Sequence, residues 1–363
     1  MKITVVGAGI VGCAIAHELA SRGATVDLID GRGAGLGATR ASAGILAPQI
    51  EGHTPQLRQL AACSLAMYDG FVRRVEADSG RRVDYERSGT AQVACGEDET
   101  QQLIDAARAL QHEGVEHAVL DRAEAMRLEP ALSDGVTAAL LVPIHGYVGA
   151  TQLTLALAEA ARARGVRLVT TTVVGIEGGS HTALVSTLEE TIQADAVIVA
   201  TGSWSVESRP FPAPSVTPIR GQLVHLRLDA AVASRVIWGA DCYLVPWRDG
   251  SVLVGATVED VGFDERPTAD GVRGLLNAAV HLVPALGRAR LHEVRVGLRP
   301  KAFDELPIIG RSDTMPSVFY ALGHYRNGVL LAPLTAAIVA DLVLDGRERE
   351  ELKMVRPGRV AEG

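Results

Sequence analysis

The hydrophobic and polar positions near the start of the chain predict three consecutive elements. The apolar run at residues 2–6 is typical of a buried strand, and residues 24–29 form a second run of this kind. Between them, the apolar side chains of residues 13–22 recur at helical spacing, and Gly23 follows as a C-terminal cap. The order strand, helix, strand predicts an α/β unit.

The pattern changes along the rest of the chain. Up to about residue 220, helical stretches alternate with short apolar runs, and beyond it the apolar runs dominate. The Asp-Gly pair at 249–250 lies between two such runs and indicates a hairpin. This order predicts an open α/β sheet and an antiparallel sheet that carries one helix. The expected helices are 57–79, 99–113, 122–127, 152–164, 269–283 and 328–344, and the expected strands are 167–174, 183–187, 190–193, 196–200, 221–228, 242–247, 251–255 and 319–322.

Length and charge narrow the class of protein. The 363 residues exceed the usual size of one domain, about 150 residues, so two or three domains are expected. Acidic residues (43) outnumber basic residues (35), the net charge is −8, and no run of Lys or Arg is present. A nucleic acid or an anionic membrane selects a basic patch or stripe, so we expect neither as a partner.

The cysteines and the longest apolar stretch indicate a cytoplasmic protein. Cys13, Cys63, Cys95 and Cys242 are far apart and form no CxxC pair. We therefore expect no zinc or other metal site and no disulfide framework, and four free thiols are typical of a reducing compartment. No signal peptide precedes the first strand, and the stretch 328–344 is too short and too interrupted for a membrane span.

A glycine motif follows the first strand directly. Gly7, Gly9 and Gly12 stand in the pattern GxGxxG, and Asp30 ends the second strand, 18 residues after Gly12. In dinucleotide-binding folds the glycines permit a tight turn, a close approach to a pyrophosphate and helix packing, and the acid holds a ribose hydroxyl. The motif predicts a dinucleotide site, with a glycine-rich turn without a ligand as the alternative. Asp30 disfavours NADP, but the motif alone does not separate NAD from FAD.

A loop of small residues starts soon after the acid. Residues 35–45 are rich in Gly, Ala and Ser, whereas a plain NAD domain is expected to have a short loop and another helix here. A small-residue loop that leads into a helix N-terminus offers backbone N–H groups to a second part of a flat cofactor. Ser42, Ala43 and Gly44 are the best candidates, and an ordinary Gly/Ala loop is the alternative.

Two later segments have the same character. Gly202 follows the strand 196–200, and ligands of open α/β sheets bind at the carboxyl ends of strands. Residues 319–329 read as strand, glycine, four polar residues, glycine and helix. This order predicts a second helix N-terminus able to face an anion or a ring carbonyl.

In combination, these stretches resemble the FAD-dependent amino-acid oxidase superfamily, which includes D-amino-acid oxidase, sarcosine oxidase and glycine oxidase, and they are most similar to glycine oxidase of the thiamine-pathway type. The resemblance covers nearly the whole chain and rests on 7–12 with Asp30, 38–48, 297–300 and 323–333. It implies non-covalent FAD, a Rossmann-like FAD-binding domain of the α/β class, and a discontinuous substrate domain of the α+β class built on an antiparallel sheet. The expected boundaries are 1–85, 144–219 and 300–363 for the FAD-binding domain, and 86–143 and 220–299 for the substrate-binding domain.

The resemblance also implies three substrate-binding residues. Arg299 corresponds to the arginine that binds the substrate carboxylate, and a planar guanidinium fits a carboxylate on physical grounds as well. A surface arginine at a strand end is the alternative. Tyr243 corresponds to the tyrosine that hydrogen-bonds the same carboxylate, with a half-buried sheet tyrosine as the alternative. Arg326 corresponds to an arginine near flavin and substrate.

For the cofactor, the resemblance implies that the backbone of Val174 meets the adenine. The full set of expected FAD-binding residues is Gly7, Gly9, Ile10, Val11, Gly12, Asp30, Gly31, Ala38, Thr39, Ser42, Ala43, Gly44, Ile45, Val174, Gly202, His324, Tyr325, Arg326, Asn327, Gly328, Val329 and Leu330.

The chain departs from the family pattern at two places. Lys301, Ala302 and Phe303 follow Pro300, where the family commonly has Gly-Thr, so a bulkier segment is expected beside Arg299. Asp241 stands where a related enzyme has a histidine. No cysteine lies between residues 299 and 326, where a covalent flavin link of the sarcosine-oxidase type is expected.

The implied activity is oxidation of the C–N bond of glycine or an N-substituted glycine by hydride transfer to flavin N5, without an obligatory protein base. The imine hydrolyses to glyoxylate and an amine, and O2 becomes H2O2. The expected partners are a small amino acid, O2 and further copies of the chain. The alternatives are an amino-acid dehydrogenase that passes electrons to a quinone or protein acceptor, an N-alkyl-glycine oxidase of a specialised biosynthetic pathway, and a non-enzymatic flavin- or NAD-binding module.

Overall fold

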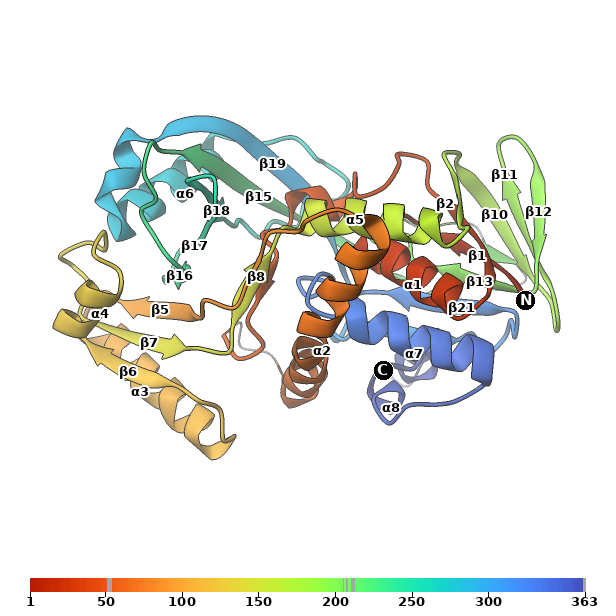
Figure 1. Ribbon diagram of the computed structural model, residues 1–363, viewed down its shortest axis with the longest axis horizontal. Helices are drawn as coiled ribbons and strands as arrows, with labels where there is room; N and C mark the ends of the chain where they lie inside the picture. Colours follow the sequence, from red (N-terminus) through yellow and green to blue (C-terminus); the bar gives the residue numbers. More distant parts are fainter. Residues whose placement is uncertain (51–53, 205, 207, 210–212, 362–363) are drawn as a thin grey trace.

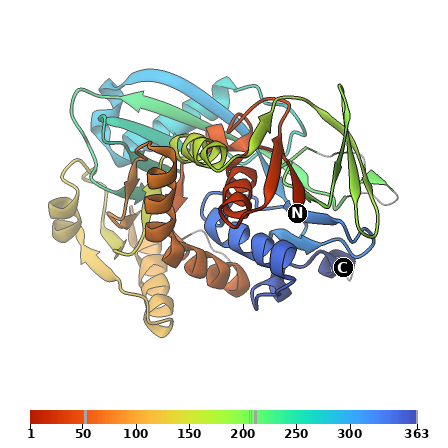
Figure 2. The same cartoon turned by 45° about the vertical axis from the view of Figure 1, so that its right-hand side comes forward.

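A computed structural model describes residues 1–361 apart from 51–53, 205, 207 and 210–212. A six-stranded sheet, in the right half of Figures 1 and 2, is central to one half of the molecule. Its inner strands pair in parallel and are almost wholly buried, as expected for a parallel sheet covered on both faces. The strand order is β20 (Ile308–Arg311), β21 (Val318–Leu322), β13 (Ala196–Val199), β1 (Lys2–Val6), β2 (Thr25–Ile29) and β9 (Arg167–Val169).

Helices cover one face of this sheet and a smaller sheet covers the other. Ile3 and Val5 of β1 pack among the helices α1 (Ile10–Ser21), α5 (Ala150–Ala163) and α7 (Ala332–Asp345), and α2 (Pro55–Ser79) packs on α5 and α7. Val6 belongs instead to the core shared with the smaller sheet. That sheet has the order β12 (Thr191–Ala194), β11 (Ala183–Thr187), β10 (Val173–Gly178) and β14 (Ser208–Arg209).

Most of the expected elements are confirmed, and three differ. The expected strand 167–174 is two strands in different sheets, because β9 pairs with β2 while β10 pairs with β11. The loop of small residues at 35–45 contains the 3₁₀ turn η1 (Ala38–Ala41) and leads into the short strand β3 (Ile45–Leu46), where a helix N-terminus was expected. The helix expected from residue 328 begins at Ala332, because the residues before it form a turn in which Asn327 O accepts from the amide of Leu331.

An eight-stranded sheet forms the other half of the molecule, in the left half of Figure 1. The hairpin at Asp249–Gly250 is confirmed, since Trp247 N donates to Ser251 O at 2.8 Å. The helix α6 (Ala269–Leu282) packs on β15 and β18, and α3 (Glu97–His112) packs on β5, β6 and β7. The strand order is β19 (Arg290–Lys301), β15 (Thr217–Arg227), β18 (Ser251–Gly255), β17 (Tyr243–Pro246), β16 (Val236–Trp238), β5 (Thr90–Ala94), β7 (Ala138–Val142) and β6 (Ala118–Asp121).

The eight-stranded sheet draws strands from both segments expected for the substrate domain. β16 pairs in parallel with β5 and so joins the two segments. β15 and β19 run slightly past the expected boundaries at 220 and 299, and the domain division stays a prediction. Three short strands form a further small sheet, with the order β3 (Ile45–Leu46), β8 (Gly146–Val148) and β4 (Tyr85–Glu86). The remaining short helical elements are α4 (Arg122–Leu128), η2 (Pro284–Arg288), α8 (Leu352–Val355) and η3 (Pro357–Ala361).

Within the described residues, no helix combines the length and the apolar character that crossing a membrane requires. The four cysteines are free thiols, two of them buried.

Candidate active site

One cavity of about 490 Å³ lies between the six-stranded and the eight-stranded sheets. Loops at the carboxyl ends of β1, β2, β13 and β21 line one side, and residues of β17 and β19 with the segment after β18 line the other. This position agrees with the rule that open α/β sheets bind ligands at the carboxyl ends of their strands. All of the expected cofactor and substrate residues line this cavity except Gly12 and Val174.

Gly12 and Val174 occupy other positions. A Cβ atom on Gly12 would lie 1.8 Å from the carbonyl oxygen of Gly7, so this glycine lets α1 pack on the preceding turn. Val174 lies on β10 with 44% of its surface exposed, outside the cavity lining. Thr171, Thr172 and Val173 line the cavity instead, because the chain turns between β9 and β10. The turn was not predicted, because one continuous strand was expected over residues 167–174.

The first turn of α1 is arranged to bind an anion. The N-cap residue is Gly9, which has no side chain to cap the helix. The amide of Ile10 donates to Thr39 Oγ1 at 3.2 Å. Gly7 adopts a φ of +106°, and a Cβ atom there would lie 2.3 Å from the carbonyl oxygen of Ala200. Glycine at this position lets the turn pack against the end of β13. The positive end of the helix that follows favours a pyrophosphate.

Asp30 connects two loops beneath the cavity. Its Oδ2 accepts from the amide of Ala8 at 2.8 Å, and its Oδ1 accepts from the amides of Arg32 and Gly33 at 2.7 and 2.9 Å. A carboxylate has about four lone-pair sites, so an acceptor position remains for a ribose hydroxyl. The Asp30 carboxylate therefore stabilises the two loops and can also make the predicted contact with the cofactor.

The small-residue loop lies directly against the eight-stranded sheet. A Cβ atom on Gly297 of β19 would lie 2.8 Å from Cβ of Ala41 in η1, so glycine at this position lets the loop approach the sheet. Gly44 has a φ of +69° and lies against the carbonyl oxygen of Val148, at 1.8 Å from its hypothetical Cβ. Both glycines hold Ala38 to Ile45 along the cavity.

The loop between β21 and α7 forms the cavity wall beside Pro300. Tyr325 N donates to Pro300 O at 2.8 Å, and Tyr325 has a φ of 49°. His324 is buried and its Nε2 lies 3.0 Å from Thr335 Oγ1. Burial lowers the pKa of His324 to about 4, so the ring is neutral at neutral pH. The loop offers backbone groups and a neutral ring to the cavity.

Arg299 reaches the cavity from β19 by crossing Gly221 of the neighbouring strand. A Cβ atom on Gly221 would lie 2.3 to 2.5 Å from the guanidinium atoms of Arg299. Nη1 of Arg299 donates to the carbonyl oxygen of Thr257 at 2.9 Å and to that of Arg220 at 3.5 Å. Among the described residues its Nε and Nη2 have no protein partner, which leaves one edge of the guanidinium for an anion.

Tyr243 and Arg326 line the same cavity as Arg299. The ring of Tyr243 lies over Gly255, whose hypothetical Cβ would be 2.3 Å from the phenol oxygen, and it packs against Trp238 at a centroid distance of 5.0 Å. The guanidinium of Arg326 lies 5.2 Å from the centre of the Tyr325 ring. Glycine opposite each of Arg299 and Tyr243 lets the two side chains lie flat on the sheet.

The two departures from the family pattern lie outside the cavity lining. Asp241 is exposed. Lys301 forms an ion pair with Glu305 at 2.8 Å, Ala302 is buried in the core, and Phe303 is 61% exposed. The bulkier segment therefore does not narrow the space beside Arg299.

Arg32, Trp204, Val258 and Glu265 are among the further lining residues that sequence patterns did not identify. Arg32, Val258 and Glu265 lie in loops without a motif. Trp204 follows Gly202 by two positions, and this proximity to a predicted ligand-binding glycine is the one signal that pointed to it.

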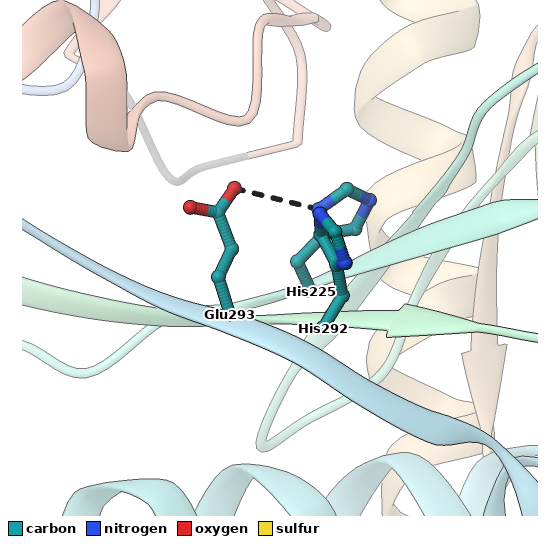
Figure 3. Close-up of side chains that lie close together, drawn as sticks. All are labelled: His225, His292 and Glu293. Carbon is teal, nitrogen blue, oxygen red and sulfur yellow. Dashed lines mark ion pairs between the residues drawn. The ribbon is translucent and has the colours of Figure 1, made fainter.

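One group of metal-ligating side chains occurs in the described part of the chain, away from the cavity (Figure 3). A β-bulge opposite His225 places both His292 and Glu293 beside it. Glu293 is already paired with Arg295, at 2.6 Å, and Arg295 also lies 3.4 Å from His225 Nδ1. The guanidinium supplies the positive charge that a metal would bring, so we read this group as a structural ion pair.

A βαβ unit with an anion-binding helix N-terminus, joined to an antiparallel sheet that presents Arg299 and Tyr243 to the same cavity, defines a dinucleotide-dependent oxidoreductase. The chain belongs to the family of FAD dependent oxidoreductases, whose family model matches residues 2–342. It is an FAD-dependent enzyme, and the cavity described above fits the cofactor of that family.

Several relatives are glycine oxidases by name. The chain is 34% identical to glycine oxidase of Geobacillus kaustophilus, over 96% of this chain and 93% of that protein. The crystal structure of glycine oxidase from the same organism matches with a TM-score of 0.92 and 32% identity, over 98% of each chain. The bifunctional protein ThiO/ThiG of Nostoc sp. is 36% identical over 94% of this chain, which spans about half (52%) of that longer protein.

Proposed function

We propose that the protein is an oxidase that acts on the C–N bond of glycine or an N-substituted glycine. The substrate loses two electrons and two protons and becomes an imine, which water hydrolyses to glyoxylate and the free amine. Dioxygen takes up the two electrons and two protons and becomes hydrogen peroxide. When bound, FAD supplies the two-electron chemistry that connects these half-reactions.

The observation that carries the proposal is the position of Arg299. Its Nη1 is held by the carbonyl oxygen of Thr257 at 2.9 Å, while its other edge has no partner in the described residues and lies in the cavity wall. An arginine fork fixed in this way binds a carboxylate with two parallel hydrogen bonds and orients the carbon next to it. An α-amino acid has its reacting C–N bond at that carbon.

The neighbouring side chains complete the binding site. We propose that Tyr243 donates its hydroxyl hydrogen to the same carboxylate and that Arg326 adds positive charge at this end of the cavity. Ala256, Val258 and Leu298 give the wall apolar surface, which excludes water from the reacting bond. We propose that no protein base is obligatory, because a neutral amine needs no further proton removal before oxidation.

The test is the flavin absorbance of the purified protein without oxygen, before and after addition of glycine. We expect glycine to bleach the flavin band and hydrogen peroxide to form once air is admitted. Arg299→Ala should raise KM about a hundredfold, because a charge-assisted bidentate contact is lost. The KM of Arg299→Lys should lie between those of Arg299→Ala and the unaltered protein. If Arg299→Ala binds and oxidises amino acids normally, the assignment is wrong.

An N-substituted glycine remains within the proposal because of one relative. The chain is similar to iminodiacetate oxidase from Chelativorans sp., with a TM-score of 0.88 and 27% identity over 98% of each chain. Sarcosine, iminodiacetate and N-alkyl glycines should therefore be compared with glycine in the same assay. Activity on glycine alone would exclude the substituted substrates. Bleaching without oxygen consumption would instead support a dehydrogenase that uses another acceptor.

A further inference from the structure

The loop from Ala256 to Thr268, between β18 and α6, lies beside Arg299 and is held by one buried arginine. Arg220 of β15 is 4% exposed. Its Nη2 donates to Glu259 Oε2 at 2.5 Å, and its Nη1 contacts Asp264 Oδ2 at 3.3 Å and donates to the carbonyl oxygen of Arg266 at 3.1 Å. Arg220 thus binds the loop at both of its ends.

Glu259 extends this attachment to the backbone of β15. The amide of Arg220 donates to Glu259 O at 2.8 Å and the amide of Glu259 donates to Arg220 O at 3.0 Å, which forms an isolated bridge. Glu259 Oε1 accepts from Thr257 Oγ1 at 2.6 Å and from Gln222 Nε2 at 2.7 Å. Burial alone raises the pKa of Glu259, but the hydrogen bonds from Arg220, Thr257 and Gln222 outweigh it and lower the pKa.

These contacts end at the atoms that hold Arg299. The two carbonyl oxygens that accept from Arg299 Nη1 belong to Thr257 and Arg220, the residues that Glu259 binds. The Thr257 amide and hydroxyl are in turn fixed by the backbone of Gln222, at 3.2 and 2.9 Å. The direction of the guanidinium therefore depends on a carbonyl whose residue is fixed by the backbone of Gln222 and by the side chain of Glu259, both outside the cavity lining.

We propose that Arg220 and Glu259 are a positioning pair for Arg299. The pair fixes the Thr257 carbonyl, and through it the rotation of the Arg299 guanidinium whose free edge receives the substrate carboxylate. Neither residue lines the cavity, so both act only through Arg299. The inference rests on the proposed carboxylate-binding role of Arg299.

The test is Glu259→Gln, which keeps the size of the side chain and removes its charge. We expect KM for the amino-acid substrate, and the Kd of acetate measured by the flavin absorbance change, to rise about tenfold while kcat changes less than about threefold. A purely structural role would lower the amount of folded protein without this split. Arg220→Lys should restore part of the affinity relative to Arg220→Met.

A matched control is another partly buried Arg–Glu pair, Arg235 with Glu129 at 2.8 Å, near β16 and outside the cavity lining. Glu129→Gln should lower the melting temperature and leave both KM and the acetate Kd unchanged. If Glu259→Gln changes KM no more than Glu129→Gln does, the positioning role is overturned.

A double variant separates this inference from the proposed function. If Arg299→Ala weakens acetate binding but Glu259→Gln does not, the positioning pair fails and the proposed function stands. If Arg299→Ala has no effect on acetate, the proposed function itself fails. If the pair acts through Arg299, Glu259→Gln should weaken acetate binding little further when Arg299→Ala is already present. If Glu259→Gln raises the acetate Kd as much in the double variant as it does alone, the inference is overturned.

Discussion

Arg32 and Glu265 join the two halves of the molecule across the cavity. Nη1 of Arg32 lies 3.2 Å from both carboxylate oxygens of Glu265. The same guanidinium lies 4.3 Å from the centre of the Trp204 ring, and the ring of Phe263 packs against Trp204 at a centroid distance of 4.9 Å. Arg32, Trp204 and Glu265 line the cavity, so this cluster, which we call the clasp, borders the space expected for the cofactor.

We predict that the clasp slows the release of FAD. Glu265→Gln removes an ion pair whose side chains are each more than a third exposed. Such pairs contribute about 0.2–1 kcal/mol, so the Kd for FAD should rise by up to about fivefold. Fluorescence of released FAD on dilution measures the rate. The exposed pair of Lys353 and Glu350 is the control, and Glu350→Gln should leave FAD release unchanged. Equal release rates for the two variants would contradict the prediction.

Gly221→Ala should displace Arg299 without changing any charge. The new Cβ would meet the guanidinium of Arg299 at 2.3 to 2.5 Å, and the flexible side chain can move away at small cost in stability. Loss of a hydrogen-bonded charge contact costs about 1.5–3 kcal/mol, so KM should rise about ten- to a hundredfold with an unchanged melting temperature. Steady-state kinetics on glycine measure this.

The control for that variant is Gly274→Ala on α6, where an added Cβ meets no atom within 4 Å. It should leave KM as it is. A normal KM in Gly221→Ala would show that the guanidinium position is unimportant for binding.

Gly44→Ala should weaken FAD binding through the backbone. Gly44 has a φ of +69°, and a Cβ atom there would lie 1.8 Å from the carbonyl oxygen of Val148. Because that oxygen belongs to the backbone, it cannot rotate away as a side chain could. A strained backbone position costs about 1–3 kcal/mol, so the melting temperature should fall and the protein should purify with less flavin. Gly70→Ala, at an open helical position of α2, should keep or raise stability. Full flavin content in Gly44→Ala would refute the argument.

Local backbone chemistry explains which parts of the site could be predicted from the sequence. Gly7, Gly9 and Gly12 act within one turn, so their spacing is visible in the chain. Most strands and helices were predicted for the same reason, because their periodicity is local. The strand 167–174 was predicted wrongly, since residues 168–174 are all apolar or β-branched and only the pairing of β9 and β10 with different sheets divides it.

Long-range contacts explain what could not be predicted. Gly221 and Arg299 meet because β15 and β19 are adjacent, and no local pattern indicates that pairing. The ion pair of Arg220 with Glu259 joins residues 39 positions apart, and that of Arg32 with Glu265 joins residues 233 positions apart. In the sequence these are ordinary charged residues, and only the fold gives them partners.

His145 should make the folded protein sensitive to mild acid. Burial, with a smaller effect of Arg87, lowers its pKa to about 3. Its Nε2 lies 2.6 Å from Gln49 Oε1, while its buried Nδ1 has no hydrogen-bond partner within the described structure, so a second proton would not be stabilised. The unfolded chain takes up this proton near pH 6.5.

The sign follows from proton uptake. Because the unfolded state binds a proton between about pH 6.5 and 3 that the folded state does not, stability is lost as the pH falls through this window. The contribution of His145 to the free energy of unfolding should be about 2 kcal/mol lower at pH 5 than at pH 7. His145→Gln removes the titrating group, so its urea unfolding should show a shallower pH dependence than that of the unaltered protein. His181→Gln, an exposed position, should keep the original slope. Identical slopes for all three proteins would mean that His145 takes up its proton as readily in the folded protein as in the unfolded chain.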